Sequence, residues 1–500
     1  MGCIATFDIG TTAVKAVLVT EDGQVLYEAS REIRTFHDGG LVEQDPMEWW
    51  DAFVLLSREL LGEADQIIGI VMSGQMQDVI PVDEDLNPLG RAILYSDGRA
   101  VKEAEEIRQK VGEAFLLETT GNHVDGTMPV AKMLWLSRHR SDVFRRARSF
   151  LISSKDFVIA RLTGETVGDV TACSTAGAMD LREKTWCERI LSSAGVSVFR
   201  MPRLLLSHRM AGIVTFTAAA VTGYPEGTPV FAGAGDAGAT TLASGIARPG
   251  QYNINLGTSG WVATVSDRPL FRESGIFNLA AMPEGGIINV VPFLNAGNVH
   301  RWVAKLFSRD GRPDYAYVQS LLERSVPGAH GVFALPYLTG ERFPVLDANV
   351  RGSFLGVTPE TDAEDMARAM MEGVAFSIRQ GMEMLEEKPA EVSIIGGGGQ
   401  VGPWCQIFAD VLGQEITVFR DAQTLPARAI AASALIGLGR FMSYDSFVET
   451  LKTGDSASVY LPSPERTAFY ADLYPRYREL YQALKGWFTD SHKGPERSFD

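Results

Sequence analysis

Phe7-Asp8-Ile9-Gly10-Thr11-Thr12-Ala13-Val14-Lys15 stands near the start of the chain, and Asn255-Leu256-Gly257-Thr258-Ser259-Gly260-Trp261 repeats its pattern half a chain later. In both stretches an apolar run leads into a glycine–threonine corner, and a second apolar run follows it. This order predicts a β-hairpin whose turn presents backbone N–H groups and hydroxyls to phosphate oxygens. Two such turns, placed so far apart, predict a duplicated fold that holds a nucleotide between its halves.

The segments around the two turns predict two α/β halves of similar layout. The elements expected in the first half are the strands 3–9, 14–20 and 24–33, the helix 46–61, and the strands 67–72 and 228–232. Those expected in the second half are the strands 252–256 and 261–265, a long helix that opens at Thr361 with a capping box to Glu364, and the strands 392–395 and 416–419.

The turn-rich stretch Ala247-Arg248-Pro249-Gly250 is expected to separate the halves. We therefore expect one domain over 1–247, a second over 248–490, and a frayed polar tail over 491–500.

Composition places the chain among globular proteins. Its 500 residues are 45% hydrophobic and 22% charged, which allows two or three domains with cores of their own. Four scattered cysteines, at no metal-ligand spacing, favour idle thiols in the cytoplasm over disulfides or zinc.

Charge and hydropathy argue against nucleic acid and against a membrane as partners. The formal net charge of −16 argues against nucleic acid. No apolar run approaches the roughly 20 residues of a membrane span. The amino terminus runs directly into a strand pattern, so no signal peptide is expected. The expected partner is therefore a small molecule.

Two aspartates at predicted strand ends are candidates for chemistry. Asp8 lies beside the first turn, where a carboxylate supplies the hard oxygen ligand that the Mg²⁺ of a nucleotide needs, directly or through water. Asp236 follows a buried strand between small neighbours, a setting that suits the general base of a phosphoryl transfer, near the same metal. The plain alternatives are an exposed turn residue for Asp8 and a helix N-cap for Asp236.

Two glycine patterns match the dinucleotide fingerprint G-x-G-x-x-G, at 233–238 and 397–402. The second also has Asp421 after the next predicted strand, as a Rossmann unit would. A glycine turn before a helix equally suits an adenosine or phosphate contact, and no P-loop sequence is present. Nicotinamide binding therefore stays open as the weaker alternative.

Polar loops follow two other predicted strands of the first half. Gly74-Gln75-Met76-Gln77-Asp78 and Tyr95-Ser96-Asp97-Gly98-Arg99 carry amides and carboxylates that could hydrogen-bond a polyol, although ordinary surface loops look the same.

Together these residues resemble the FGGY carbohydrate kinases of the actin-like ATPase superfamily. The resemblance rests on both glycine–threonine turns, on Gly396 to Gly399, on Gly352-x-Phe354-x-Gly356-Val357 with Asp365-Met366, Ala369 and Glu372, and on Pro129-x-x-Lys132-x-x-Trp135. Within the family the chain is most similar to the xylulose kinases, through 42–46, Trp49-Trp50, 74–76, 97–99 and 335–342.

The resemblance implies a duplicated actin-like, ribonuclease H-like ATPase fold with a nucleotide cleft between two domains. It implies that the protein uses ATP and Mg²⁺ to phosphorylate a sugar or polyol, most of all D-xylulose. It also implies a homodimer. Asp236 becomes the catalytic base. Further site residues implied by the resemblance are, for the nucleotide and metal, Asp8, Gly10, Thr11, Thr12, Lys15, Gly257, Thr258, Gly397, Gly398, Gly399 and Gln400, and for the sugar Gln75, Met76, Gln77, Asp97 and Asp236.

The chain departs from the xylulose kinases around the expected sugar site, where Gln77 stands in place of their usual histidine, and also at Asp78, Tyr95, Ser96 and Ala237. A changed hydrogen-bond partner can redirect preference among polyols. L-Xylulose, ribulose, glycerol and erythritol therefore remain alternative substrates. An actin-like ATPase that phosphorylates no sugar is the alternative from another class.

Overall fold

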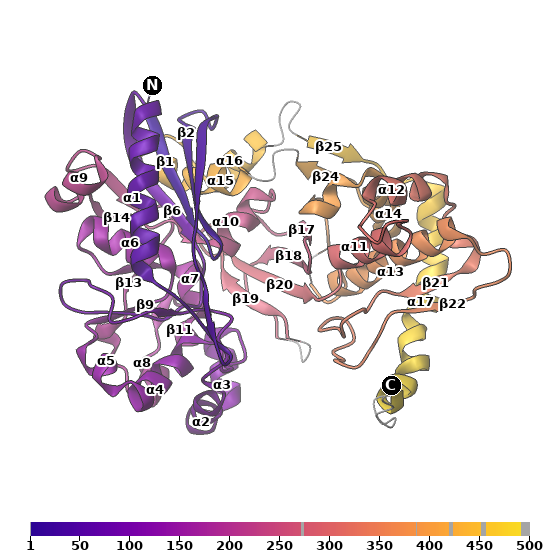
Figure 1. Ribbon diagram of the computed structural model, residues 1–500, viewed down its shortest axis with the longest axis horizontal. Coiled ribbons are helices and arrows are strands. Elements are labelled where there is room, and N and C mark those ends of the chain that lie inside the picture. The colour runs from indigo at the N-terminus through magenta and orange to yellow at the C-terminus, as the bar shows by residue number, and fades with distance from the viewer. Residues whose placement is uncertain (1, 272–274, 387, 420–423, 452–456, 492–500) are drawn as a thin grey trace.

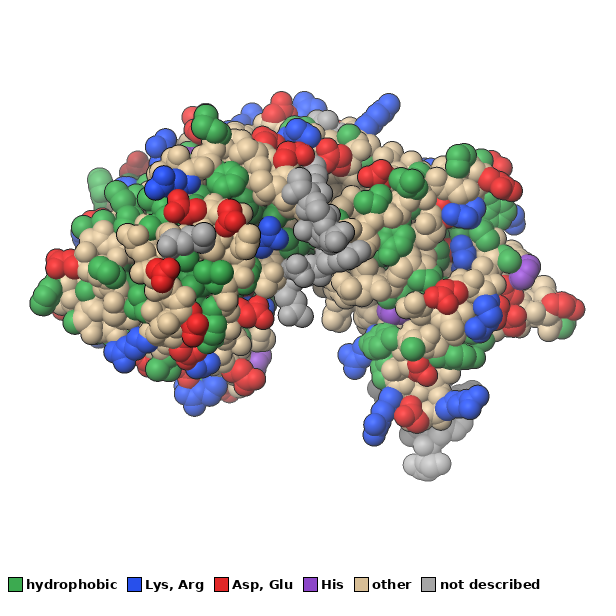
Figure 2. Space-filling model, turned by 90° about the horizontal axis from the view of Figure 1, so that it is seen from above, with side chains coloured by type: hydrophobic (Ala, Val, Ile, Leu, Met, Phe, Trp, Pro, Cys, Tyr) green, Lys and Arg blue, Asp and Glu red, His purple; other side chains and the backbone are tan. Residues whose placement is uncertain are grey.

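The computed structural model describes residues 2–271, 275–386, 388–419, 424–451 and 457–491, so Asp421 and most of the expected tail lie outside it. The chain forms two lobes side by side (Figure 1), and a notch separates their outlines when they are seen from above (Figure 2). Each lobe is built on one seven-stranded sheet.

The first sheet is a meander continued by parallel strands. Its strands in spatial order are β14 (Met210–Ile213), β15 (Pro229–Phe231), β6 (Gln66–Gly74), β1 (Gly2–Ile9), β2 (Ala13–Thr20) and β3 (Val25–Glu32), with β16 (Ala234–Gly235) paired to the end of β6. β1, β2 and β3 run antiparallel, whereas β6, β15 and β16 run parallel to β1. The nearly continuous burial of β1 and β6 reflects their central place, covered on both faces.

The second sheet repeats this topology. Its strands in spatial order are β25 (Ala457–Tyr460), β24 (Ile416–Phe419), β23 (Glu391–Ile395), β17 (Gln251–Leu256), β18 (Gly260–Ser266), β20 (Ile287–Phe293) and β19 (Phe277–Ala280). β17 and β18 form the expected hairpin, and β23 and β24 run parallel to β17. The duplicated α/β fold predicted from the two turns is confirmed.

Helices cover both faces of the first sheet. α1 (Pro46–Glu63) packs on one face and buries Trp49 and Trp50 there, while α15 (Leu425–Gly437) lies on the other against β1 and β6. The yellow-orange α15 in Figure 1 therefore belongs in space to the first lobe, although it comes late in the chain. It also packs on α10 (Asp236–Ala243), and a shared apolar cluster joins these elements.

The principal helix of the second lobe is α13 (Ala363–Met382). Its capping box consists of Asp362 and Asp365, one residue later than the expected pair of Thr361 and Glu364. Short acidic side chains cap a helix as well as threonine and glutamate do, and the pattern alone does not set the register. Val374 and Ile378 of this helix are buried in the core of this lobe.

The remaining elements complete the lobes. In the first half they are β4 (Phe36–Asp38), β5 (Leu41–Gln44), β7 (Ile80–Val82), β8 (Ala92–Ile93), α2 (Val101–Val111), α3 (Glu113–Thr120), α4 (Pro129–His139), α5 (Ser141–Arg146), β9 (Ser149–Leu151), α6 (Ser154–Thr163), β10 (Val167–Asp169), α7 (Val170–Cys173), β11 (Met179–Asp180), β12 (Thr185–Trp186), α8 (Glu188–Ser193), β13 (Arg203–Leu205) and α9 (Phe216–Thr222). In the second half they are α11 (Gly297–Leu306), α12 (Tyr315–Arg324), β21 (Phe333–Leu335), β22 (Ser353–Leu355), α14 (Gly402–Leu412), α16 (Tyr444–Leu451) and α17 (Pro464–Ser491).

None of the helices in the described part of the chain is long and apolar enough to cross a membrane. The four cysteines are free thiols, and Cys3, Cys173 and Cys405 are buried.

Candidate active site

The carboxyl ends of three neighbouring strands bring the two candidate aspartates together. Asp8 is the next-to-last residue of β1 and lies in register with Ser73 of β6, and Gly235 of β16 is in register with Gly74 of the same strand. Ser73 Oγ donates a 3.0 Å hydrogen bond to Asp8 Oδ1. Asp236, the first residue of α10, therefore lies at the same edge of the sheet as Asp8.

Asp236 is poised to exchange a proton near neutral pH. The residue as a whole keeps access to solvent at the sheet edge, while protein atoms crowd its carboxylate. Burial and the negative charges of Asp8 and Asp169 raise its pKa to about 7, although the Ala237 N–H donates to Oδ1 at 2.7 Å. A carboxyl group with such a pKa is suited to general-base work.

A buried ionic cluster fixes the backbone beneath Asp236. Lys155 Nζ lies 2.6 Å from Asp156 and 2.7 Å from Asp169, and all three side chains are fully buried. Asp169 Oδ1 in turn accepts from the Gly235 N–H at 3.3 Å. The cluster thus anchors the residue that precedes the base, a support that the sequence reading missed because its members lie in unrelated segments.

The first turn is braced by side chains from the neighbouring loop. Thr11 Oγ1 donates to Gln75 Oε1 at 2.8 Å, and Gln75 Nε2 donates to Gln44 Oε1 at 2.8 Å. Gln44 Nε2 also donates to the Thr11 carbonyl at 2.6 Å. Gln75 is buried, so its amide ties the phosphate turn to the next loop. Thr12 and Lys15 remain exposed beside Gly10, with Lys15 paired across the hairpin to Asp8.

The loop after β6 presents the next two candidate sugar residues. Met76 lies against Gly235, where a Cβ would stand 2.0 Å from its sulfur. Gln77 adopts a left-handed φ of 66°, and its Nε2 donates to Thr127 Oγ1 at 2.7 Å. Such a conformation is costly for a residue with a side chain and is often found at functional sites.

Asp97 is held by protein groups. Its carboxylate accepts from the Val42 N–H at 2.6 Å and from two Arg99 guanidinium nitrogens at 2.8 and 2.6 Å, and it is fully buried. Burial raises its pKa, but these hydrogen bonds outweigh burial and lower it. The structure therefore shows Asp97 shaping its loop, while Tyr95 and Ser96 in the same loop are exposed.

Asp78 is the departure with the largest electrostatic effect. It is fully buried, and its Oδ1 accepts from the Tyr95 N–H at 3.2 Å. Burial raises its pKa well above the usual range, against the attraction of Lys132. Lys132 Nζ donates to the carbonyls of Leu94 and Gln77, and burial lowers its pKa to about 8.

The second lobe contributes a cavity of about 760 Å³. Gly257 and Thr258 of the second turn line it together with Gly397, Gly398 and Gln400. The turn is held by Asn255 Oδ1, which accepts from the Gly257 N–H at 2.8 Å. Gly399 does not line the cavity. A Cβ added at Gly399 would contact Ile394 and Val418 of the sheet instead. A site of this size suits a nucleoside with its phosphates.

The same cavity has a wall that the sequence reading missed. Asn298, His300 and Arg301 come from α11, and Tyr315 and Gln319 come from α12. Burial lowers the pKa of His300 to about 4, so this ring is neutral and packs against Tyr315. These residues lie on amphipathic helices with no motif of their own, so no sequence signal marks them.

Comparison with known proteins gives consistent matches over the whole chain. The model of the FGGY family of carbohydrate kinases, N-terminal domain, matches residues 3–243, and the C-terminal domain model of the same family matches 252–434. The xylulose kinase of Bacillus subtilis (strain 168) is 30% identical over 498 residues, covering 97% of this chain and 98% of the relative.

The gluconokinase of Bacillus licheniformis is 27% identical over 497 residues and covers 96% of both chains. The crystal structure of a ligand-bound xylulose kinase from Lactobacillus acidophilus matches with a TM-score of 0.87 and 26% identity, covering 98% of this chain and 99% of that one.

Proposed function

The chain belongs to the FGGY family of carbohydrate kinases, and we propose that this ATP-dependent sugar kinase converts D-xylulose to D-xylulose 5-phosphate. The observation that carries the reaction is that Asp8 and Asp236 lie at the carboxyl ends of β1 and β16, the two strands that flank β6. The full-length relatives named xylulose kinases support the choice of sugar. We further propose that the domains divide at about residue 247, that the protein forms a homodimer and that it is cytoplasmic. These proposals rest on the turn chemistry and the family.

In the proposed reaction Asp236 accepts the proton of the terminal sugar hydroxyl. The freed oxygen attacks the γ-phosphorus of ATP, a new O–P bond forms, and the bond from phosphorus to the β,γ-bridging oxygen breaks, so that ADP leaves. The Lys155 cluster holds Gly235 so that the carboxylate keeps its direction. The N–H groups and hydroxyls of the two turns face the phosphates and stabilise the charge that develops there.

Asp8 and Asp236 fit the Mg²⁺ that accompanies ATP. Among the described residues no three metal-binding side chains gather. Magnesium bound with a nucleotide needs only one or two carboxylates, since phosphates and water complete its shell. The two neighbouring carboxylates, whose pKa values burial raises, are the anionic donors at this edge. Bound Mg²⁺ supplies charge neutralisation for the phosphates.

The charge around the site supports a neutral sugar over a sugar acid. The carboxylates of this edge oppose further negative charge, because Asp8 raises the pKa of Asp236 and Asp236 in turn contributes to the raised pKa of Asp78. A gluconate carboxylate in this neighbourhood would meet like charges, which cost several kcal/mol when desolvated, by the order of magnitude of Coulomb's law. This favours a ketose or polyol, although a gluconokinase is among the relatives.

The test is a coupled ADP-release assay with Mg-ATP against D-xylulose, L-xylulose, D- and L-ribulose, glycerol, erythritol and gluconate. We expect the highest kcat/KM for D-xylulose and the lowest for gluconate. A higher kcat/KM for another neutral sugar would replace the substrate and keep the reaction. ATP hydrolysis without stimulation by any sugar would point instead to an actin-like ATPase.

Gln77 is the residue to vary in the same panel. Gln77→His restores the side chain usual in xylulose kinases, so we expect the kcat/KM ratio of D-xylulose to the other sugars to rise. Val101→Ala, an exposed change at the start of α2, is the control. Unchanged ratios in Gln77→His would remove Gln77 from the selective contacts.

A further inference from the structure

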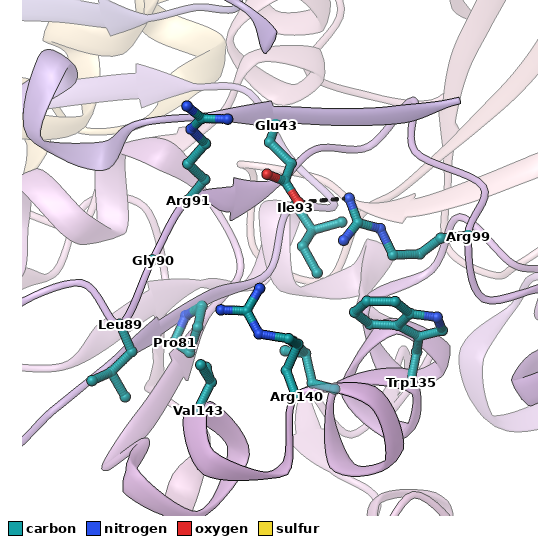
Figure 3. Close-up of a pocket in the computed structure, with 11 residues that line it drawn as sticks. Glu43, Pro81, Leu89, Gly90, Arg91, Ile93, Arg99, Trp135, Arg140 and Val143 are labelled. Atoms are coloured by element: carbon teal, nitrogen blue, oxygen red, sulfur yellow. Dashed lines mark hydrogen bonds and ion pairs between the residues drawn. The ribbon is translucent and has the colours of Figure 1, made fainter. Parts of the chain in front are cut away.

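A second cavity lies in the first lobe, between the end of β5, the segment before β8, and the junction of α4 and α5. Its volume is about 260 Å³. Figure 3 shows Glu43 and Arg99 above it, Arg140 directed into it from the helix junction, Trp135 at its side, and Arg91 at its upper rim. None of the nucleotide residues named above lines this cavity.

The cavity carries an excess of positive charge in a chain whose net charge is −16. Three arginines line it, and Glu43 is its one lining carboxylate. Glu43 shares the Arg99 guanidinium with Asp97, since Arg99 Nη2 donates to Glu43 Oε1 at 2.8 Å and to Asp97 Oδ2 at 2.6 Å. In the described part of the chain neither Arg91 nor Arg140 forms an ion pair, and Arg91 stacks on Phe36 at 3.6 Å. Two positive charges are thus left without a carboxylate.

The rest of the wall is apolar. Pro81, Leu89, Ile93 and Val143 line it, and the indole of Trp135 stands beside the Arg99 guanidinium at 4.9 Å. The arginines alone would suffice to bind a free oxyanion. The apolar wall and the volume give room for a small organic group attached to the anion, in a site somewhat below the roughly 300 to 1,000 Å³ of drug-sized pockets.

We propose that this cavity binds a phosphate group, with Arg140 as its principal ligand and Arg91 and Arg99 as neighbours. Guanidinium groups suit phosphate because their planar donors match two oxygens at once. The source is either free phosphate or the phosphate of a small metabolite, and the apolar wall favours the second. The proposal does not depend on which sugar the kinase phosphorylates.

The position of Arg99 links this cavity to the candidate sugar loop. Arg99 donates to Glu43 and, from Nε and Nη2, to Asp97. Asp97 in turn holds the Val42 N–H. A phosphate that competes with Glu43 for Arg99 acts on the residue that orients the Asp97 loop, so its binding reaches the sugar side.

The experiment measures binding by calorimetry without nucleotide or sugar, at constant ionic strength, with inorganic phosphate and with phenyl phosphate as probes. Arg140→Gln is compared with Arg145→Gln, which removes an exposed charge from α5 outside the cavity. We expect Arg140→Gln to raise the Kd of both probes roughly tenfold, the loss of one charge-assisted hydrogen bond. Arg145→Gln should stay within about twofold of the wild type.

Glu43→Gln gives a change of opposite sign. Removal of the competing carboxylate should lower the Kd roughly threefold, by the loss of one like charge near the anion. Tighter binding of phenyl phosphate than of inorganic phosphate identifies an organic phosphate, and equal binding identifies the free ion. Equal Kd values for Arg140→Gln and Arg145→Gln overturn the site. Because Arg140 is exposed, both variants should melt at the same temperature in chloride buffer, which confirms that folding is not the cause.

Discussion

The two hairpins share a backbone and differ in chemistry. In the first lobe Asp8 is the next-to-last residue of its strand, and Lys15 stands opposite it across the turn. In the second lobe Asn255 occupies the position of Asp8, and Trp261 stands opposite. Asp8 accepts from a serine hydroxyl of the next strand, whereas Asn255 Oδ1 accepts from the Gly257 N–H of its own turn. The same fold therefore carries charge in one lobe and a neutral backbone cradle in the other.

The loops that follow the neighbouring parallel strands repeat this contrast. The register places Ser73 beside Asp8 and Ile395 beside Asn255. Beyond these residues the first lobe has Gly74-Gln75-Met76-Gln77, and the second has Gly396-Gly397-Gly398-Gly399. Side chains at the first edge can select a sugar and move a proton. Bare glycines at the second allow a large nucleotide to approach the backbone.

Asp236→Asn should have the largest effect, because it removes the proton acceptor from the charged edge and keeps its shape. General-base catalysis contributes about 10² to 10⁴ in rate, so we expect kcat to fall roughly a thousandfold. The increase in melting temperature on adding Mg-ATP should persist. A variant with near wild-type kcat would contradict the assignment of Asp236 as base.

Exchanging the acid and the amide between the hairpins tests the comparison directly. Asp8→Asn gives the first lobe the side chain of the second, and we expect kcat/KM for Mg-ATP to fall on the order of a hundredfold as a metal carboxylate is lost. Asn255→Asp can still accept from the Gly257 N–H, but it places a negative charge near the phosphates.

For Asn255→Asp we expect the KM for ATP to rise roughly tenfold, the effect of one like charge at a partly screened distance. Steady-state kinetics with ATP as the varied substrate measures both exchanges. Equal, small changes in both variants would show that the two edges do not differ in their electrostatic roles.

The glycine loop separates a steric effect on nucleotide binding from an effect on folding. Gly397 lines the cavity, and a Cβ there meets nothing within 4 Å, whereas a Cβ at Gly398 lies 2.6 Å from Leu256 and 2.8 Å from Trp404. Gly397→Ala should raise the KM for ATP a fewfold and leave the free energy of unfolding within about 0.5 kcal/mol. Gly398→Ala should lower that free energy by about 1–3 kcal/mol through overpacking.

Urea denaturation checks stability and kinetics checks KM for these two variants. A Gly397→Ala protein that unfolds as easily as Gly398→Ala would show that the loop has no free side toward the nucleotide.

Local sequence sufficed for the framework because turns and strands are coded by neighbouring residues. The hairpins at Gly10 and Gly257, the buried strands after them and the glycine loop at Gly397 follow the expected places. The capping box of α13 lay one residue away, since Asp362 and Thr361 carry equivalent capping groups. The G-x-G-x-x-G matches occur here in a chain of the carbohydrate kinase family. Such a pattern indicates only a tight turn before a helix.

Contacts between distant segments could not be predicted from the sequence. Gln75 stays a predicted sugar ligand, and its amide also joins Thr11 to Gln44, three residues that only folding brings together. The cavity wall on α11 and α12 and the Lys155 cluster arise in the same way. The placement of α15 on the first sheet depends on the association of both lobes, which no single stretch of sequence encodes.

The pH dependence of the reaction should give the most specific test of the charged edge. Asp236 works as a base only when ionised, and its pKa of about 7 is raised by burial and by the negative charge of Asp8. With both substrates well below their KM, the apparent second-order rate should therefore fall about tenfold per pH unit below pH 7 and level off above it.

Removal of the Asp8 charge favours ionisation of Asp236, so Asp8→Asn should move the inflection to lower pH, although its rate is lower throughout. Glu63→Gln, a charge-matched change at the far end of α1, should leave the inflection in place. An inflection that Asp8→Asn does not move would mean that the two carboxylates titrate independently, and the charged edge would then act as two separate groups.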